Sequence, residues 1–137
     1  MSGESTRATI DAYLTRLSER DLDGAVGLCS DDVVWDVPFS GAVPWSGQHT
    51  GHAGVREFFR QIHEHLVPEE FTIAHIVVDG TEGVILGHLR DTVKATGAPL
   101  ATHFAAHVTV TDGKISHYRL FEDSHGLARA LAPAGKA

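Results

Sequence analysis

The sequence has few of the features that mark secreted or membrane proteins. Its 137 residues include a single cysteine, Cys29, so no disulfide can form within the chain. No apolar run approaches the roughly 20 residues of a membrane-spanning helix. The opening MSGESTRATI also lacks the apolar stretch of a signal peptide. We therefore expect a cytoplasmic protein with no membrane partner.

Basic residues are scarce as well. Lys and Arg total 11 against 18 Asp and Glu, which gives a formal net charge of -7, and the basic residues do not cluster. Nucleic-acid phosphates require a basic surface, so nucleic acid is not an expected partner. The length and a hydrophobic content of 42% predict a single domain over residues 1–137 with its own core. Residues 1–5 and 133–137 are expected to be frayed.

Metal and cofactor motifs are also missing, despite ten histidines. His103 and His107 share one face of a predicted strand, but four strand residues separate them by roughly 13 Å, too far to hold one ion. The sequence contains no phosphate-binding loop, dinucleotide fingerprint or nucleophile elbow. We therefore expect neither a metal nor a cofactor.

The apolar pattern has a helical period in the first half of the chain and a strand period in the second. Helices are predicted at residues 6–20, 21–30, 52–66 and 124–131. Strands are predicted at residues 33–37, 69–80, 82–97, 98–113 and 114–123, with a Pro- and Gly-rich loop at 38–51. This order favours an α+β fold in which helices pack on one face of a bent antiparallel sheet.

The predicted strand containing HFAAHV has two chemically different faces. Strand side chains alternate, so His103, Ala105 and His107 point one way while Phe104 and Val108 point the other. Alternation alone does not decide which face lines the interior of the protein.

Several segments resemble a known family. Residues 12–38, AYLTRLSERDLDGAVGLCSDDVVWDVP, resemble the opening of the ketosteroid isomerase family in the nuclear transport factor two-like superfamily. Residues 51–59, 92–97 and 105–115 resemble its SnoaL-like relatives. The resemblance implies a cystatin-like cone, in which a curved antiparallel sheet wraps around N-terminal helices and encloses an apolar pocket.

The resemblance also implies an orientation for the two-faced strand. It places the histidine face toward the cavity and the apolar face, with Phe104 and Val108, on the outside. Relatives commonly pair through that outer sheet face, so a homodimer is expected.

Carried over residue by residue, the family's catalytic positions are mostly vacant. The donor tyrosine of the isomerases falls on Tyr13, but the base falls on Val37 and the protonated carboxyl near Ala105. The acid of the cyclases and epoxide hydrolases falls on Leu120. Any chemistry must therefore use other residues of the same scaffold.

An Arg–Asp pair on the second long strand offers a further resemblance. Arg90 and Asp91 resemble a pairing used by epoxide hydrolases. Adjacent strand residues point to opposite faces, so the two cannot both line one pocket without a bulge.

A histidine in an apolar cavity can exchange a proton near pH 7 when a partner fixes its tautomer. The predicted catalytic residues are His107 as acid/base, Tyr13 as hydroxyl donor and Glu122 as charged partner. His103 is an alternative to Glu122 as the residue that orients His107. The predicted substrate-binding residues are Trp35, Val37, Phe39, Trp45, Phe59, His88, His103, Ala105, Tyr118 and Leu120. Purely structural roles remain open: a core aromatic for Tyr13, a hydrogen-bonded histidine for His107 and a rim charge for Glu122.

The function favoured by the sequence is that of a small SnoaL-like enzyme. It would bind an oxygenated hydrophobic molecule of polyketide or steroid type and perform cofactor-free isomerisation, cyclisation or dehydration. Because this fold hosts many activities, a limonene-type epoxide hydrolase and a non-catalytic small-molecule-binding protein stay open as alternatives.

Overall fold

The computed structural model describes residues 3–39 and 41–132. The helices are α1 (Gly3–Ser18), α2 (Leu22–Gly27), α3 (Gly51–His65) and α4 (Ser124–Leu131). The strands are β1 (Cys29–Val37), β2 (Gly47–Thr50), β3 (Leu66–Asp79), β4 (Glu82–Val93), β5 (Pro99–Thr111) and β6 (Lys114–Glu122). Residues 3–5, expected to fray, are helical; the other expected frayed residues, 1–2 and 133–137, lie outside the described range.

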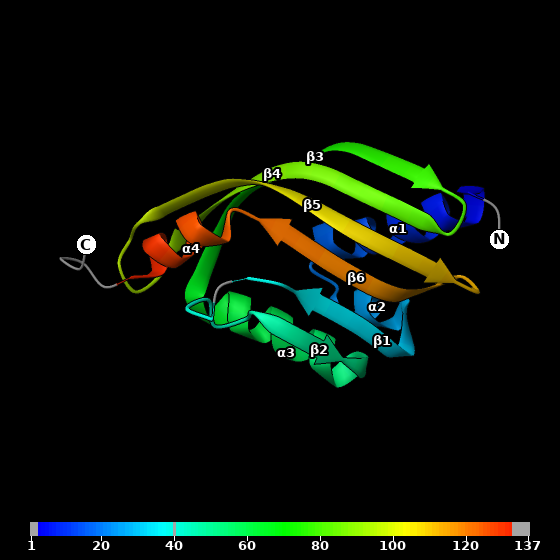
Figure 1. The fold of residues 1–137 in the computed structure, drawn as a ribbon, viewed down its shortest axis with the longest axis horizontal. Coiled ribbons are helices and arrows are strands. Elements are labelled where there is room, and N and C mark those ends of the chain that lie inside the picture. Colours follow the sequence, from blue (N-terminus) through cyan, green and yellow to red (C-terminus); the bar gives the residue numbers. More distant parts are fainter. Residues whose placement is uncertain (1–2, 40, 133–137) are drawn as a thin grey trace.

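The six strands form one curved sheet in the order β2-β1-β6-β5-β4-β3. Neighbouring strands are antiparallel except β1 and β6, which run parallel. Figure 1 shows the long strands arched over α1 and α3, so these helices pack on the concave face of the sheet. The predicted α+β fold is confirmed. The structure adds β2, a short edge strand inside the segment predicted to be a loop.

An aromatic cluster fills the base of this interior. Trp35 of β1 is fully buried and stacks on Tyr118 of β6, with ring centroids 3.8 Å apart. Tyr13 of α1 approaches both rings at about 6 Å, and Phe58 of α3 packs against Trp35 at 5.9 Å. Because large aromatic rings bury much apolar surface, this cluster ties both helices to the sheet.

One bulge in the β5–β6 hairpin decides which face of β5 points inward. The hairpin turns at residues 112–113, where positive φ angles of 52° and 76° fit a two-residue turn. In β6, Ser116 is an extra residue with no opposed residue on β5, so the pairing beyond it shifts by one position. As a result Val108, rather than His107, lies opposite Tyr118.

The predicted orientation of β5 is therefore wrong. Directly opposed residues in an antiparallel pair point to the same face of the sheet. Val108 lies opposite Tyr118, which points inward, so Val108 points inward as well. Phe104 is 6% exposed and Val108 is fully buried. His103 and His107 are on the outer face of the sheet, toward solvent. A one-residue difference in register therefore places every side chain of β5 on the opposite face of the sheet from the one predicted.

The adjacent pair Phe104 and His103 tests this orientation. Phe104→Ala should lower the free energy of unfolding by about 2 kcal/mol, because a buried ring is lost, although one side of it borders a cavity. His103→Ala should change it by less than about 0.5 kcal/mol, since the side chain is exposed. Urea denaturation of both variants provides the measurement. Equal losses, or a larger loss for His103→Ala, would contradict the orientation.

Candidate functional site

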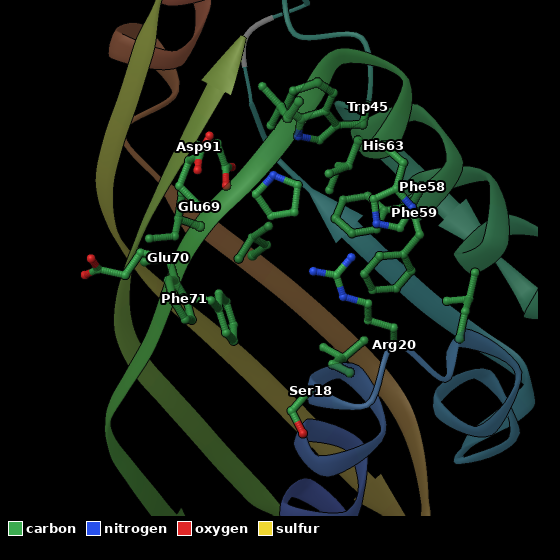
Figure 2. A pocket seen from close by; sticks show the side chains of 18 of the residues that line it. Ser18, Arg20, Trp45, Phe58, Phe59, His63, Glu69, Glu70, Phe71 and Asp91 are labelled. Carbon is green, nitrogen blue, oxygen red and sulfur yellow. The ribbon is translucent and has the colours of Figure 1, made fainter. Parts of the chain in front are cut away.

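A cavity of about 840 Å³ lies between α1, α3 and the inner face of the sheet. This volume falls in the range that holds a small organic ligand. Most of the lining is apolar, including Leu14, Leu17, Phe58, Phe59, Ile62, Leu100, Phe104 and Leu120. Figure 2 shows the ring of Phe59 on the helix side and Phe71 on the strand side. The arrangement can therefore hold an apolar molecule out of water.

Stacked phenylalanines form part of the strand wall. The Phe71 and Phe104 rings are nearly parallel, with centroids 5.2 Å apart, and both line the cavity. Phe104 lies over Gly87, where a Cβ atom would collide with the ring and with the Thr72 carbonyl oxygen. Glycine is therefore required at this position of β4. Phe71 is 53% exposed, so its ring offers a surface on which a ligand can stack.

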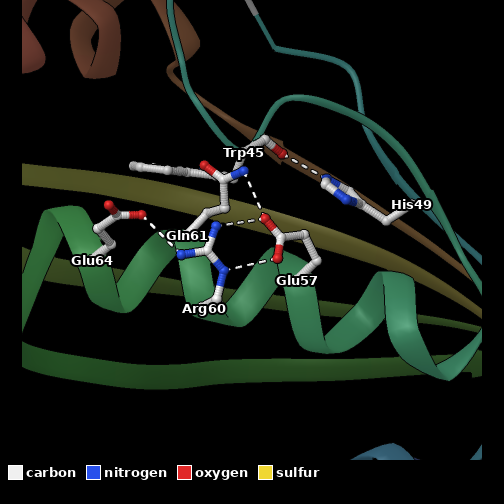
Figure 3. A network of polar contacts seen from close by, with 6 residues as sticks. All are labelled: Trp45, His49, Glu57, Arg60, Gln61 and Glu64. Carbon is white, nitrogen blue, oxygen red and sulfur yellow. Dashed lines mark hydrogen bonds and ion pairs between the residues drawn. The ribbon is translucent and has the colours of Figure 1, made fainter.

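Trp45 closes the cavity from the loop before α3. The His49 ring of β2 donates through Nε2 to the Trp45 carbonyl oxygen at 2.9 Å, which fixes the loop that precedes β2 (Figure 3). On the surface of α3, Arg60 donates to the Glu57 carboxylate at 2.8 Å and to that of Glu64 at 3.2 Å. These exposed contacts belong to the helix surface, whereas Trp45 is buried and lines the cavity.

Two tyrosine hydroxyls meet at the cavity wall. Tyr13 and Tyr118 are hydrogen-bonded to each other, and both line the cavity. Burial raises the pKa of each phenol well above its ordinary value, so both remain neutral at physiological pH. A pair of hydroxyls has two protons and needs only one for the bond between them. The other is available to a ligand oxygen.

Two carboxyl groups, Asp91 of β4 and Glu122 at the end of β6, also line the cavity. Neither carboxyl has a hydrogen bond or ion pair with any residue in the described ranges. Burial raises the pKa of Asp91 to about 6, with a further contribution from the negative charge of Glu69. Burial also raises the pKa of Glu122 to about 7, and the charge of Asp91 adds to the effect. Partly desolvated acids of this kind are typical of functional sites.

The structure brings together six of the predicted site residues and separates the others. Lining the cavity are Tyr13, Trp45, Phe59, Tyr118, Leu120 and Glu122. Trp35 and Val37 are fully buried in the core behind the lining, and Phe39 is half-buried outside it. The predictions that these three residues line the cavity are wrong. For Trp35 the reason is that the rings of Phe58, Phe59 and Tyr118 cover it from the cavity side.

The histidine face lies on the opposite side of the sheet from the cavity. The predictions that His88, His103, Ala105 and His107 line the pocket are wrong, and the bulge described above is the reason for β5. His107 Nε2 lies 2.8 Å from Glu82 Oε1, which also accepts a hydrogen bond from Thr109 at 2.8 Å.

His88 shares this outer face. It pairs with His103 across the β4–β5 ladder, and the two rings are 5.9 Å apart. The histidine contacts are therefore part of the outer sheet surface and do not reach the cavity.

Asp91 is the cavity acid that sequence reasoning missed. Alternation showed that Arg90 and Asp91 must point to opposite faces, but not which of them points inward. The available signal was the run Leu89, Asp91, Val93, which places Asp91 on the same face as two apolar residues. In the structure Arg90 is exposed and Asp91 faces the cavity.

Across residues 3–39 and 41–132, no three His, Cys, Asp or Glu side chains converge as a metal site. In the same part of the chain, no helix is long and apolar enough to cross a membrane. The cavity is suited to holding an apolar molecule next to neutral tyrosine hydroxyls and ionisable carboxyl groups.

The raised pKa of Glu122 predicts a pH-dependent stability. A carboxyl whose pKa is about 7 in the folded protein and 4.5 when unfolded stabilises the fold below pH 4.5, and this contribution is lost as the pH rises through 7. Glu122→Gln keeps the site neutral. It should raise the free energy of unfolding by about 2 kcal/mol at pH 8, with almost no gain at pH 4.5.

Chemical denaturation at the two pH values measures this difference. Asp32→Asn, at an exposed position of β1, is the matched control for loss of one carboxylate. A Glu122→Gln variant that is destabilised at pH 8, or that gains equally at both pH values, would rule out an uncompensated buried carboxyl.

Solved structures of similar fold include NTF2-like proteins and proteins named as enzymes. An NTF2-like protein from Burkholderia xenovorans LB400 matches with a TM-score of 0.84 and 22% identity, covering 96% of this chain and 99% of that one. TerC co-crystallised with polyporic acid matches with a TM-score of 0.82 and 21% identity over 93% and 98%. An LEH-like epoxide hydrolase of M. tuberculosis matches with a TM-score of 0.70 and 18% identity over 93% and 90%.

At these identities the likeness shows the fold alone. Structures described as a candidate isomerase and a candidate SnoaL-like polyketide cyclase have the same fold. No curated protein matches the chain. The SnoaL-like domain family matches residues 10–118, which include both tyrosines and Asp91. The chain therefore belongs to the SnoaL-like domain family.

Proposed function

We propose that this protein is a cofactor-free proton-transfer enzyme, an isomerase, cyclase or dehydratase, acting on an oxygenated hydrophobic small molecule of polyketide or steroid type. The observation that carries the proposal is the pair Asp91 and Glu122. Both carboxyls lie on the wall of a mainly apolar cavity without a partner in the described part of the chain. An apolar cavity alone would suit a binding protein; the two acids supply the chemistry.

The two carboxyls have complementary roles in this mechanism. Between pH 6 and pH 7 the main state has a charge on Asp91 and a proton on Glu122. The Asp91 carboxylate takes a proton from the carbon next to a substrate carbonyl. As negative charge develops on the carbonyl oxygen, the protonated carboxyl of Glu122 donates a hydrogen bond to it. Return of the proton to another carbon completes an isomerisation. In a dehydration, a hydroxyl on the neighbouring carbon takes up the proton held by Asp91, and its C–O bond breaks to release water.

The tyrosine pair supports the same step from another side of the cavity. Tyr13 and Tyr118 remain neutral and have one proton free for a ligand oxygen. A hydrogen bond of this type strengthens as charge builds on the oxygen, and the surrounding apolar side chains strengthen it further by excluding water. The sequence prediction of Tyr13 as hydroxyl donor is therefore retained in this proposal, now with Tyr118 as its partner.

Epoxide hydrolysis is the second candidate function, and the same acid pair favours it. Ionised Asp91 removes a proton from a water molecule as the water oxygen bonds to an epoxide carbon. The C–O bond of that carbon breaks, and protonated Glu122 gives its proton to the epoxide oxygen, which yields a diol. The epoxide hydrolase among the similar structures supports this reaction class for the fold. It differs from the leading proposal in requiring water as a reactant.

Deuterium incorporation distinguishes the reaction classes. In D₂O, the protein should catalyse exchange at the carbon next to the carbonyl in at least one member of a panel of apolar ketones, followed by NMR. The rate should peak between pH 6 and pH 7, since Asp91 must be ionised and Glu122 protonated. Asp91→Asn should lower the rate by about 100-fold or more.

His107→Ala is the matched control from the outer face and should keep the wild-type rate. Diol formation from a parallel panel of epoxides, without ketone exchange, would favour the hydrolase instead. Ligand binding with neither reaction, or an unchanged rate in Asp91→Asn, would contradict the proton-transfer proposal.

We also propose that the outer face of the sheet forms a homodimer. The original reason, an apolar outer face of β5, no longer holds because Phe104 and Val108 point inward. Other large apolar side chains take their place: Leu86 and Phe121 flank Ala105 across three strands, and Val77 lies on the neighbouring β3. Exposed apolar side chains grouped on one sheet face are typical of an interface.

The oligomeric state of Phe121→Glu tests the dimer. Wild-type protein should sediment as a dimer, and a charge at the centre of this face should shift it to monomer. The control is Val67→Glu, because Val67 is equally exposed but lies at the start of β3. A monomeric wild type, or a dimer that Phe121→Glu does not disturb, would contradict the interface.

A further inference from the structure

Arg20 adopts an unusual backbone conformation directly after α1. Its φ angle is +58°, and among described non-glycine residues only Asp112, in the β5–β6 turn, is also positive. The Arg20 amide donates to the Leu17 carbonyl at 3.0 Å, and the following amide donates to the Arg16 carbonyl at 2.9 Å. This pair of bonds defines a helix-ending motif whose left-handed position is normally occupied by glycine.

Arginine is poorly suited to that position on stability grounds. A Cβ atom makes the left-handed conformation sterically unfavourable, and glycine avoids the penalty. Asparagine and aspartate offset part of the penalty through short local hydrogen bonds, which a long guanidinium side chain does not make. Strained residues of this kind concentrate at functional sites.

The conformation directs the Arg20 side chain into the cavity. Figure 2 shows its guanidinium turned into the pocket on the helix side, near Phe59, while Asp91 and Glu69 lie on the strand side. In the described ranges the guanidinium has no ion pair and no hydrogen bond. The second cation of the lining, Lys94, differs in that its Nζ donates to the His63 carbonyl at 2.5 Å, which holds it near the end of α3.

None of the described acids of the cavity lining forms an ion pair with Arg20. The Asp21 carboxylate caps α2 by accepting from the Gly24 amide at 2.9 Å, and it pairs with Arg16 at 3.2 Å. Glu69 accepts a hydrogen bond from Thr92 at 3.0 Å, and Figure 2 shows Glu70 turned away from the cavity. The Arg20 guanidinium is solvent-exposed and faces a mainly apolar cavity, and apart from Asp21 the acids of the lining lie on the strands.

We propose that Arg20 recognises an anionic oxygen group of the ligand, so that the substrates are apolar molecules bearing a carboxylate or an acidic enol or phenol. This inference rests on the proposed function for the cavity and deepens it. A guanidinium binds such oxygens through paired N–H donors. With the anionic end at Arg20, the rest of the molecule extends across the cavity toward Asp91 and Glu122, which orients the reacting carbon.

Two fluorescent dyes with the same aromatic skeleton test the inference. 8-Anilino-1-naphthalenesulfonate has an anionic sulfonate, and N-phenyl-1-naphthylamine lacks it. The wild-type protein should bind the sulfonate dye about tenfold more tightly than the neutral one, the value of one charge-assisted hydrogen-bonding contact. Arg20→Gly should abolish this preference and leave the affinity for the neutral dye unchanged.

The same substitution should raise the melting temperature by about 3 °C, because glycine relieves the backbone strain. Loss of anion preference together with higher stability is a combination that a merely structural arginine would not give. Arg90→Gln, which removes one exposed positive charge from the outer face, is the matched control and should keep the preference.

Each outcome separates this inference from the proposed function, because dye binding needs no proton transfer. If the wild type shows no preference for the sulfonate dye, or if Arg20→Gly retains it, the inference is overturned while ketone exchange can still stand. If the preference depends on Arg20 but no exchange occurs, the cavity recognises acids and the proposed chemistry is wrong.

Discussion

The pairing of β5 with β6 is the constraint on which the site depends. Because Ser116 is an extra residue in β6, the ladder beyond it is displaced by one position relative to the Asp112–Gly113 turn. The period of a strand is two, so this displacement sends Phe104, Ala106 and Val108 inward and the histidines outward. Strand β5 thus gives the cavity an apolar wall, and its polar chemistry has to come from β4, β6 and α1.

The amino-acid pattern predicted the architecture well because it depends on many residues at once. The two longer helices and the strand meander follow from periods repeated over eight or more residues, where one misplaced residue changes little. The inward face of β5 depends on one bulge, for which the sequence offers no distinct signal, since Ser116 is followed by His117 and both tolerate an outward position. Local register was therefore the information that the sequence lacked.

In the candidate site, too, residues on regularly patterned elements were predictable, and residues whose direction depends on local backbone geometry were not. Tyr13, Tyr118, Leu120 and Glu122 could be placed at the cavity because they lie on well-patterned elements. Asp91 was recognisable only as one of two adjacent residues with opposite directions. Arg20 had no signal at all, since its inward direction comes from a left-handed backbone at the end of α1. If Arg20 binds an anionic group as proposed, a functional requirement has replaced glycine, the locally most stable residue, at this position.

The central claim is that Asp91 and Glu122 are acids that line a mainly apolar cavity without a compensating partner among residues 3–39 and 41–132. The most direct test is a pH titration of the carboxyl carbons by ¹³C NMR in protein labelled at Asp and Glu, with Asp91→Asn and Glu122→Gln assigning the two signals. The account predicts that Glu122 titrates near pH 7 and Asp91 near pH 6. Midpoints near pH 4 for both groups, as for carboxyls in water, would contradict it.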